Sequence, residues 1–153
     1  MPYLRLYSPS LSIELKRKLA FQLTEALLNA LGLDDSYRHR TTIHFDPFQP
    51  DDIAVGGELI SDGGAPDYLL EITERSLSGA QKSAAVNALV PVLMKNFGLR
   101  KEQSWKVNIR FESYEPSDFA VGGNFLDDVE PNNPFRLRSR AMKTATTPVT
   151  QAS

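Results

Sequence analysis

Two copies of one short motif decide the fold of this chain: Ala54-Val55-Gly56-Gly57 recurs 66 residues later as Ala120-Val121-Gly122-Gly123. The similarity extends around the motif without a gap, and residues 2–60 share 17 identities with residues 68–126 over 59 pairs. The identities fall at prolines, glycines and apolar positions, where a backbone turns or a core is packed. Two copies are too few for a solenoid, so we expect a single duplicated domain with pseudo-twofold symmetry.

Each copy has the pattern of a strand, a helix, a second strand and a Gly-Gly turn. Short apolar-rich segments of strand length lie at 2–7 and 41–45 in the first copy, and at 68–73 and 106–111 in the second. These four segments predict the strands of one sheet.

The two helices are predicted from their ends and from one apolar stripe. Leucine recurs at every fourth residue from 15 to 31, which is the spacing of one helix face over a core. Ser12 and Ser78 are suitable N-caps. Gly32 and Gly98 stand where a helix end favours a left-handed residue.

Two β-α-β units predict an α+β fold, with a four-stranded mixed sheet and two helices on one face. We expect the other face to carry too many apolar residues to remain in water, which predicts self-association. The duplicated domain is expected to span residues 1–130. Residues 131–153 contain four bases and no acid, and we expect them to form a flexible basic tail.

Composition excludes several classes of function. The chain has 153 residues, no cysteine and a formal net charge of -2. The absence of cysteine excludes disulfides, thiolate catalysis and cysteine-bound metals; because no secretory signal is visible either, we expect a cytoplasmic protein. No apolar run approaches the roughly 18 residues of a membrane span. The net charge gives no sign of a nucleic-acid partner, so we expect neither a membrane nor a nucleic acid as partner.

The second residue is the candidate for catalysis. Methionine before a small residue such as proline is normally removed in cells, which would leave Pro2 as a free secondary amine at the start of a strand. An α-amino group titrates at about 7.7–8.0 in model peptides, and burial in an apolar site lowers its pKa further. An amine tuned toward the working pH is an efficient general base.

Pro2 at the start of a β-α-β unit, a helix that follows Ser12 and the closing Ala-Val-Gly-Gly motif together resemble the tautomerase superfamily of 4-oxalocrotonate tautomerase-like proteins. The resemblance covers residues 2–126, and the tandem copies are similar to its longer, fused members. It implies a cofactor-independent tautomerase without a metal, in which Pro2 is the general base for keto–enol interconversion of a small 2-oxo acid. It also implies a homotrimer that forms a pseudo-hexamer. The second copy has Tyr68 in place of the proline, so we expect one working site per chain.

The resemblance further implies an arginine that holds the substrate carboxylate, because a guanidinium grips a carboxylate at two points. Arg75 is the best candidate. If the first strands of the two copies lie antiparallel, the start of one strand at Pro2 faces the end of the other near Glu74 and Arg75. The alternative is that Arg75 is a surface residue that pairs with Glu74 or Glu71.

Four more residues complete the expected substrate site. The positions where other members of the superfamily carry a second arginine are Thr42 and Asn108 here, so Arg38 or Arg110 is expected to assist instead. Asn108 could donate a hydrogen bond to the enol oxygen. Phe119 matches the aromatic wall residue that the small tautomerases keep before their Gly-Gly turn.

Two other functions remain open. Pro2 could act as a general acid in a dehalogenase, hydratase or decarboxylase of a three-carbon acid, but Glu112 and Asp118 are out of register for the carboxylate that such a reaction needs. The chain could also be an inactive, oligomeric member of the family. His39 and His44 are expected to face opposite sides of a strand region, and no metal site is predicted.

Overall fold

The structure, a computed structural model, describes residues 1–130 and 133–137. The chain divides into two units, Met1–Ser113 and Tyr114–Ser153. The main elements in chain order are β1 (Tyr3–Ser8), α1 (Ile13–Leu31), the short 3-10 helix η1 (Asp35–Arg40), β2 (Thr42–Pro47), β5 (Tyr68–Arg75), α2 (Gly79–Asn96), the short 3-10 helix η3 (Lys101–Lys106) and β6 (Val107–Tyr114).

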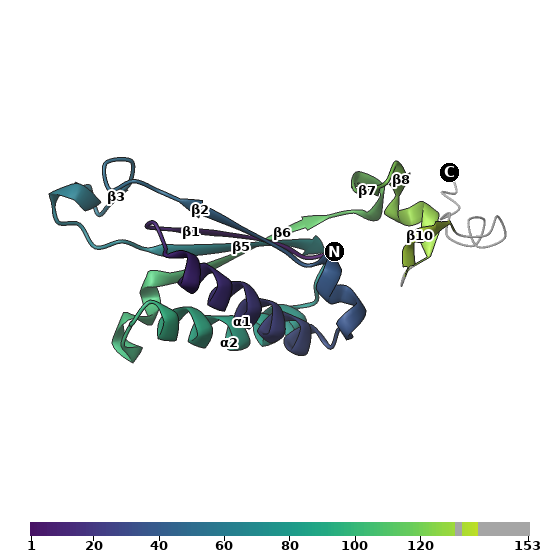
Figure 1. Cartoon of the computed structure of the whole chain (residues 1–153), viewed down its shortest axis with the longest axis horizontal. Coiled ribbons are helices and arrows are strands. Elements are labelled where there is room, and N and C mark those ends of the chain that lie inside the picture. The colour runs from purple at the N-terminus through teal and green to yellow at the C-terminus, as the bar shows by residue number, and fades with distance from the viewer. Residues whose placement is uncertain (131–132, 138–153) are drawn as a thin grey trace, which may run out of the picture. The chain divides into compact units, whose positions relative to one another are not determined.

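The four long strands form one mixed sheet in the order β2-β1-β5-β6. Strand β1 runs parallel to β2, with Leu4 opposite Ile43, and antiparallel to β5, with Leu4 opposite Ile72. Both helices lie on one face of this sheet, side by side (Figure 1). The predicted α+β architecture is confirmed, and so is the antiparallel pairing of the first strands of the two copies.

The helix ends lie where the sequence predicts them. The Ser12 hydroxyl accepts a hydrogen bond from the backbone N–H of Leu15 at 3.2 Å, and Ser78 forms a capping box with Gln81. Gly32 ends α1 with a φ of 64°, a left-handed conformation that costs a residue with a side chain about 1–2 kcal/mol.

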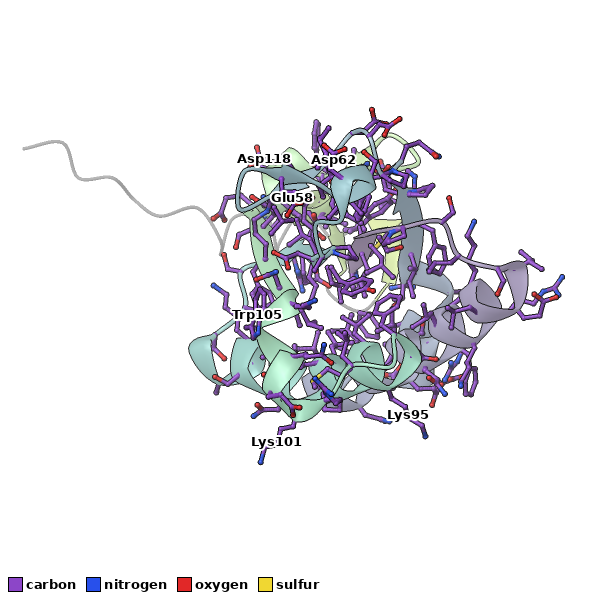
Figure 2. The ribbon with its side chains drawn as sticks, turned by 90° about the vertical axis from the view of Figure 1, so that its left-hand side faces the viewer. Glu58, Asp62, Lys95, Lys101, Trp105 and Asp118 are labelled. Atoms are coloured by element: carbon purple, nitrogen blue, oxygen red, sulfur yellow. The ribbon has the colours of Figure 1, made fainter. Side chains whose placement is uncertain are left out.

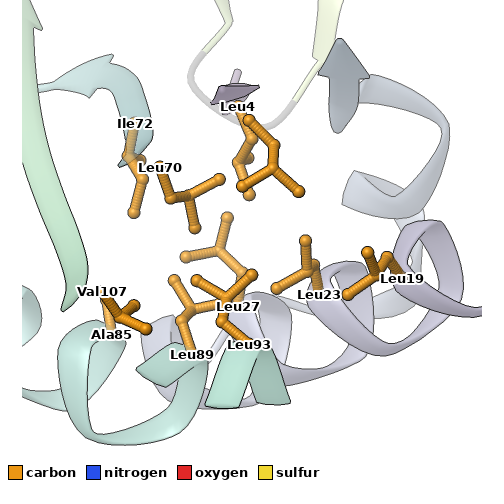
Figure 3. Close-up of a cluster of buried hydrophobic side chains, with 11 residues drawn as sticks. Leu4, Leu19, Leu23, Leu27, Leu70, Ile72, Ala85, Leu89, Leu93 and Val107 are labelled. Atoms are coloured by element: carbon orange, nitrogen blue, oxygen red, sulfur yellow. The ribbon is translucent and has the colours of Figure 1, made fainter. Parts of the chain in front are cut away.

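The core lies between the sheet and the two helices. Side chains from β1 and β5 point toward those of α1 and α2 and leave little of either surface in contact with water (Figure 3). On the outside of the helical layer, Lys95 and Lys101 project away from the sheet (Figure 2). The core cluster consists of Leu4, Leu6, Leu19, Leu23, Leu27, Leu70, Ile72, Ala85, Leu89, Leu93 and Val107.

The uncovered face of the sheet is mostly polar, so the expectation of an apolar open face was wrong. Side chains alternate between the two faces along β1. Because Leu4 and Leu6 point to the helices, Tyr3, Arg5 and Tyr7 point to the uncovered face. The side chains on the open face bond to one another: Tyr3 with His44 at 3.1 Å, Arg5 with Asp46 at 4.0 Å, and Arg110 with Glu71.

The repeated Ala-Val-Gly-Gly motif forms a two-residue hairpin in each copy. Gly56 and Gly57 have φ values of 64° and 85°, and Gly122 and Gly123 have values of 57° and 85°. Positive φ at both central residues is what the tight turn of a β-hairpin requires. The strands are β3 (Ala54–Val55) with β4 (Glu58–Leu59), and β7 (Ala120–Val121) with β8 (Asn124–Phe125).

The remaining elements are short. Strand β9 pairs antiparallel with β10, which falls within the predicted basic tail; residues 131–132 and 138–153 of that tail lie outside the described residues. Across the described part of the chain, no helix has both the length and the apolar character to span a membrane. The elements are η2 (Ile60–Asp62), η4 (Pro116–Asp118), η5 (Leu126–Asp128), β9 (Val129–Glu130) and β10 (Asn133–Leu137).

Candidate active site

Strand pairing brings the N-terminus to the end of β5. Tyr3 lies opposite Thr73, and continuing this register by one residue sets Pro2 opposite Glu74. Pro2 is fully buried, and its carbonyl accepts a hydrogen bond from the backbone N–H of Thr42 at 3.1 Å. The proline ring is therefore held on the core side of the sheet by the neighbours of β1.

A buried carboxylate stands at this position. Glu74 is only 8% exposed, and its Oε1 accepts hydrogen bonds from the Met1 ammonium at 2.7 Å and from the backbone N–H of Arg75 at 2.8 Å. A carboxylate leaves water at a high cost unless charged or N–H groups replace the lost hydrogen bonds, and here both kinds do. The N-terminus thus ends in an ion pair with a neighbouring strand.

From the sequence, Glu74 was expected only as a possible partner of Arg75, without a role of its own. The signal was present in the alternation of β5: Leu70, Ile72 and Glu74 are two residues apart and share the face that the helices cover. A carboxylate in phase with two core residues indicates a buried charge that needs a partner.

A small pocket of about 140 Å³ opens beside the ion pair. This is smaller than the roughly 300–1,000 Å³ of sites for drug-sized ligands, so it suits a small molecule. Met1 lines it, and Pro2 lies buried directly behind Met1 in the chain. The pocket is formed by the end of α1, η1, the end of β5 and the start of α2, through Met1, Leu31, Leu33, Tyr37, Glu74, Arg75, Ser76, Leu77 and Gln81.

Arg75 is the predicted site residue that the structure brings into this pocket together with the N-terminus. Its backbone N–H bonds to Glu74, but in the part of the chain that the structure describes its guanidinium makes no ion pair with Glu74 or with Glu71. Glu71 pairs with Arg110 instead. Arg75 therefore borders the pocket, and its guanidinium is held by neither of these carboxylates.

Arg38 is placed outside the pocket lining. It lies in η1, where its Nε is 2.7 Å from Asp35 Oδ1 and its terminal nitrogen pairs with Glu25 of α1. These hydrogen bonds, the one to Asp35 first, raise the pKa of the Arg38 guanidinium. Tyr37, the residue before it, does line the pocket and was not among the predicted site residues.

The other predicted substrate residues also lie elsewhere. Arg110 is on the open face of the sheet, where it pairs with Glu71 and lies 3.3 Å from Glu112; the bond to Glu71 is the main cause that raises the pKa of its guanidinium. Asn108 is exposed on β6. Phe119 belongs to the second unit and stacks on Tyr114 at 5.0 Å between ring centroids. Their roles stay predictions.

The described residues include no group of three or more histidine, aspartate or glutamate side chains arranged to hold a metal ion. His44 uses its Nδ1 in a hydrogen bond with the Tyr3 hydroxyl at 3.1 Å. The ionisable residues that line the pocket are Met1, through its ammonium, Glu74, Arg75 and Tyr37.

Comparison with solved structures finds several proteins that share the fold of this chain. No protein-family model and no curated protein matches the chain. Among solved structures, a wild-type fused 4-OT that forms an asymmetric trimer is similar at a TM-score of 0.70 and 21% identity, over 81% of this chain and 95% of that chain. The chain has the tautomerase-superfamily fold.

Other tautomerase-superfamily structures give the same result. A macrophage migration inhibitory factor from Toxoplasma gondii is similar at a TM-score of 0.63 and 17% identity, over 80% of this chain and 98% of that chain. A member of the cis-3-chloroacrylic acid dehalogenase family is similar at 0.65 and 12% identity, over 81% of this chain and 82% of that chain. Proteins with different names, fused 4-OT and the cis-3-chloroacrylic acid dehalogenase family among them, share this fold, so the fold by itself leaves the reaction open.

Proposed function

We propose that the chain is a cofactor-independent tautomerase of this superfamily, and that Pro2, freed by removal of Met1, moves the proton in keto–enol interconversion of a small 2-oxo acid. The observation that carries this proposal is that the N-terminus and Arg75 line one pocket, next to the buried Pro2. Such a reaction needs one group that moves a proton and one that binds the substrate carboxylate, and we assign these roles to Pro2 and Arg75.

The roles follow from the chemistry of the substrate. Toward the ketone, Pro2 is the general base that removes a proton from the carbon next to the carbonyl; toward the enol, the same amine returns it as a general acid. Arg75 binds the carboxylate and stabilises the negative charge that builds up on the enolate. Removal of Met1 would also clear the part of the pocket that this residue lines.

The test is the ketonisation of phenylenolpyruvate and of 2-hydroxymuconate by the wild type and by Pro2→Ala, each with an intact mass that shows Met1 removed. We expect a wild-type rate well above that of buffer, and a loss of about 10²-fold or more in the variant, which is the usual contribution of a general acid or base. A wild-type rate equal to that of buffer, or a rate indifferent to the substitution, would reject the proposal.

A second candidate function is supported by Glu74. A hydratase or dehalogenase needs a carboxylate near Pro2 to activate water, and Glu74 lies in the pocket beside the N-terminus. Turnover of 3-haloacrylates that is lost in Glu74→Gln would favour this reaction over tautomerisation.

We further propose that the working form is a homotrimer, with residues 1–130 of each chain as one functional domain. The support is that the similar fused 4-OT structure is a trimer.

A further inference from the structure

The carboxylate beside the N-terminus has no role in the tautomerase reaction as described above. Glu74 is buried, holds the Met1 ammonium at 2.7 Å and is fixed by the backbone N–H of Arg75 at 2.8 Å. When Met1 is removed, its ammonium leaves, and Glu74 loses that partner. The new N-terminal amine belongs to Pro2.

Geometry places that amine close to the same carboxylate. Three covalent bonds join the Met1 nitrogen to the Pro2 nitrogen, which limits their separation to about 3.6 Å. Because the Met1 nitrogen is 2.7 Å from Glu74 Oε1, the Pro2 nitrogen lies within about 6 Å of that oxygen. The strand register, which sets Pro2 opposite Glu74, gives the same neighbour independently.

We propose that Glu74 is a positioning residue that holds the Pro2 amine in its protonated form, so that the enzyme at neutral pH starts each cycle as a proton donor to an enol. This rests on the proposed function. A carboxylate at about 4–6 Å favours the charged form of an amine. The substrate class that follows is the enol of a 2-oxo acid, rather than its ketone.

The other charged groups at the pocket decide how strong this effect is. Arg75 is a cation and acts on the amine in the opposite direction to Glu74. Because Glu74 is held within about 6 Å of the Pro2 nitrogen, we expect its effect to be the larger one in the free protein, and a bound substrate carboxylate neutralises Arg75. Tyr37 from η1 also lines the pocket. The end of α1 contributes Leu31 and Leu33, and α2 contributes the uncharged Gln81. With substrate bound, Glu74 is therefore the charge that acts on Pro2.

The reaction balances without a co-reactant other than water. The Pro2 ammonium gives a proton to the enol carbon, a C–H bond forms, and the electrons of the carbon–carbon double bond make that bond. The enol O–H bond breaks, its proton leaves to water, and the oxygen becomes a carbonyl. A proton from water then returns Pro2 to the ammonium form beside Glu74.

The experiment is a titration that needs no turnover. Protein labelled with ¹⁵N-proline, with Met1 removed as shown by intact mass, is titrated by NMR through the Pro2 ¹⁵N signal, with a peptide of residues 2–7 as reference. We expect the midpoint of the wild type to lie above that of the peptide. Glu74→Gln should lower the midpoint by roughly one pH unit or more.

The control is Glu102→Gln, because Glu102 also forms an ion pair, with Arg100 at 2.9 Å, but both side chains are exposed on η3 and at its start. Its Pro2 midpoint should equal that of the wild type. In ketonisation of phenylenolpyruvate, kcat/KM should fall as pH rises through the Pro2 midpoint, and in Glu74→Gln this fall should move to lower pH by the same amount.

Equal midpoints in the wild type and Glu74→Gln, or a wild-type midpoint at or below that of the peptide, would overturn the role of Glu74. The wild-type comparison stands even where Glu74→Gln does not fold. A shifted midpoint in a protein without ketonisation activity would instead reject the proposed function and leave the ion pair intact. Ketonisation activity together with an unshifted Pro2 midpoint would reject the pairing of Pro2 with Glu74 and leave the proposed tautomerase function standing.

Discussion

At the scale of single residues, we assign substrate binding and proton transfer to different side chains: Arg75 binds the carboxylate and Pro2 moves the proton. Arg75 lies at the end of β5 with its guanidinium unpaired among the described residues, whereas Arg38 and Arg110 each pair with two carboxylates. A guanidinium that already pairs with two carboxylates has fewer N–H donors left to bind a third carboxylate. The carboxylate of the substrate is therefore expected to bind Arg75.

We predict that Arg75→Gln raises KM for a 2-oxo acid about 10- to 100-fold, because a hydrogen bond to a charged group contributes about 1.5–3 kcal/mol. Steady-state ketonisation kinetics measure this. Arg100→Gln is the matched control, since Arg100 is an exposed arginine that pairs with Glu102. An unchanged KM in Arg75→Gln would show that the carboxylate binds elsewhere.

The proximity of Pro2 and Arg75 could be predicted from the sequence, because it depends only on the antiparallel pairing of β1 with β5, which the repeat predicts. Glu74 was missed because its burial depends on which face of β5 the helices cover. The ion pairs of Arg38 and Arg110 could not be predicted, because their partners Glu25 and Glu71 lie on other elements and are brought to them only by the fold.

At the scale of elements, the repeat sets the ends of the helices through backbone geometry. Gly32 has a φ of 64°, and a Cβ added there would meet nothing within 4 Å. The cost of a side chain is then that of the left-handed backbone alone. Gly79, inside the first turn of α2, has equally open surroundings without the positive φ.

We predict that Gly32→Ala lowers the free energy of unfolding by about 1 kcal/mol, and that Gly79→Ala leaves it unchanged or raises it by up to about 1 kcal/mol. Urea unfolding followed by circular dichroism, at equal chain concentration, measures both. Equal losses in the two variants would mean that the C-terminal end of α1 does not depend on its glycine.

The strands and helices follow from local spacing, and their predicted bounds lie within three residues of the observed ones. The open sheet face could not be predicted in the same way. Whether Tyr3, Arg5 and Tyr7 face water or a neighbour depends on which side the helices cover, and the ion pairs across that face join β1 to β2 and β5 to β6.

At the scale of the whole molecule, the prediction concerns assembly. The fused 4-OT structure that this chain resembles is a trimer. We predict that light scattering gives three times the chain mass of 17.0 kDa, with the mass constant on dilution through the micromolar range. A stable species of the single-chain mass would contradict the trimer.

The central claim is that the Pro2 amine does the chemistry. Its most direct test compares two forms of the same wild-type chain, one with Met1 removed and one with Met1 retained, each verified by intact mass, in ketonisation of phenylenolpyruvate. Arg75 is common to both forms, but in the second Met1 still lines the pocket, and the Pro2 nitrogen is part of a peptide bond and cannot carry a proton. We predict that only the processed form is active. Equal rates in the two forms would contradict the account.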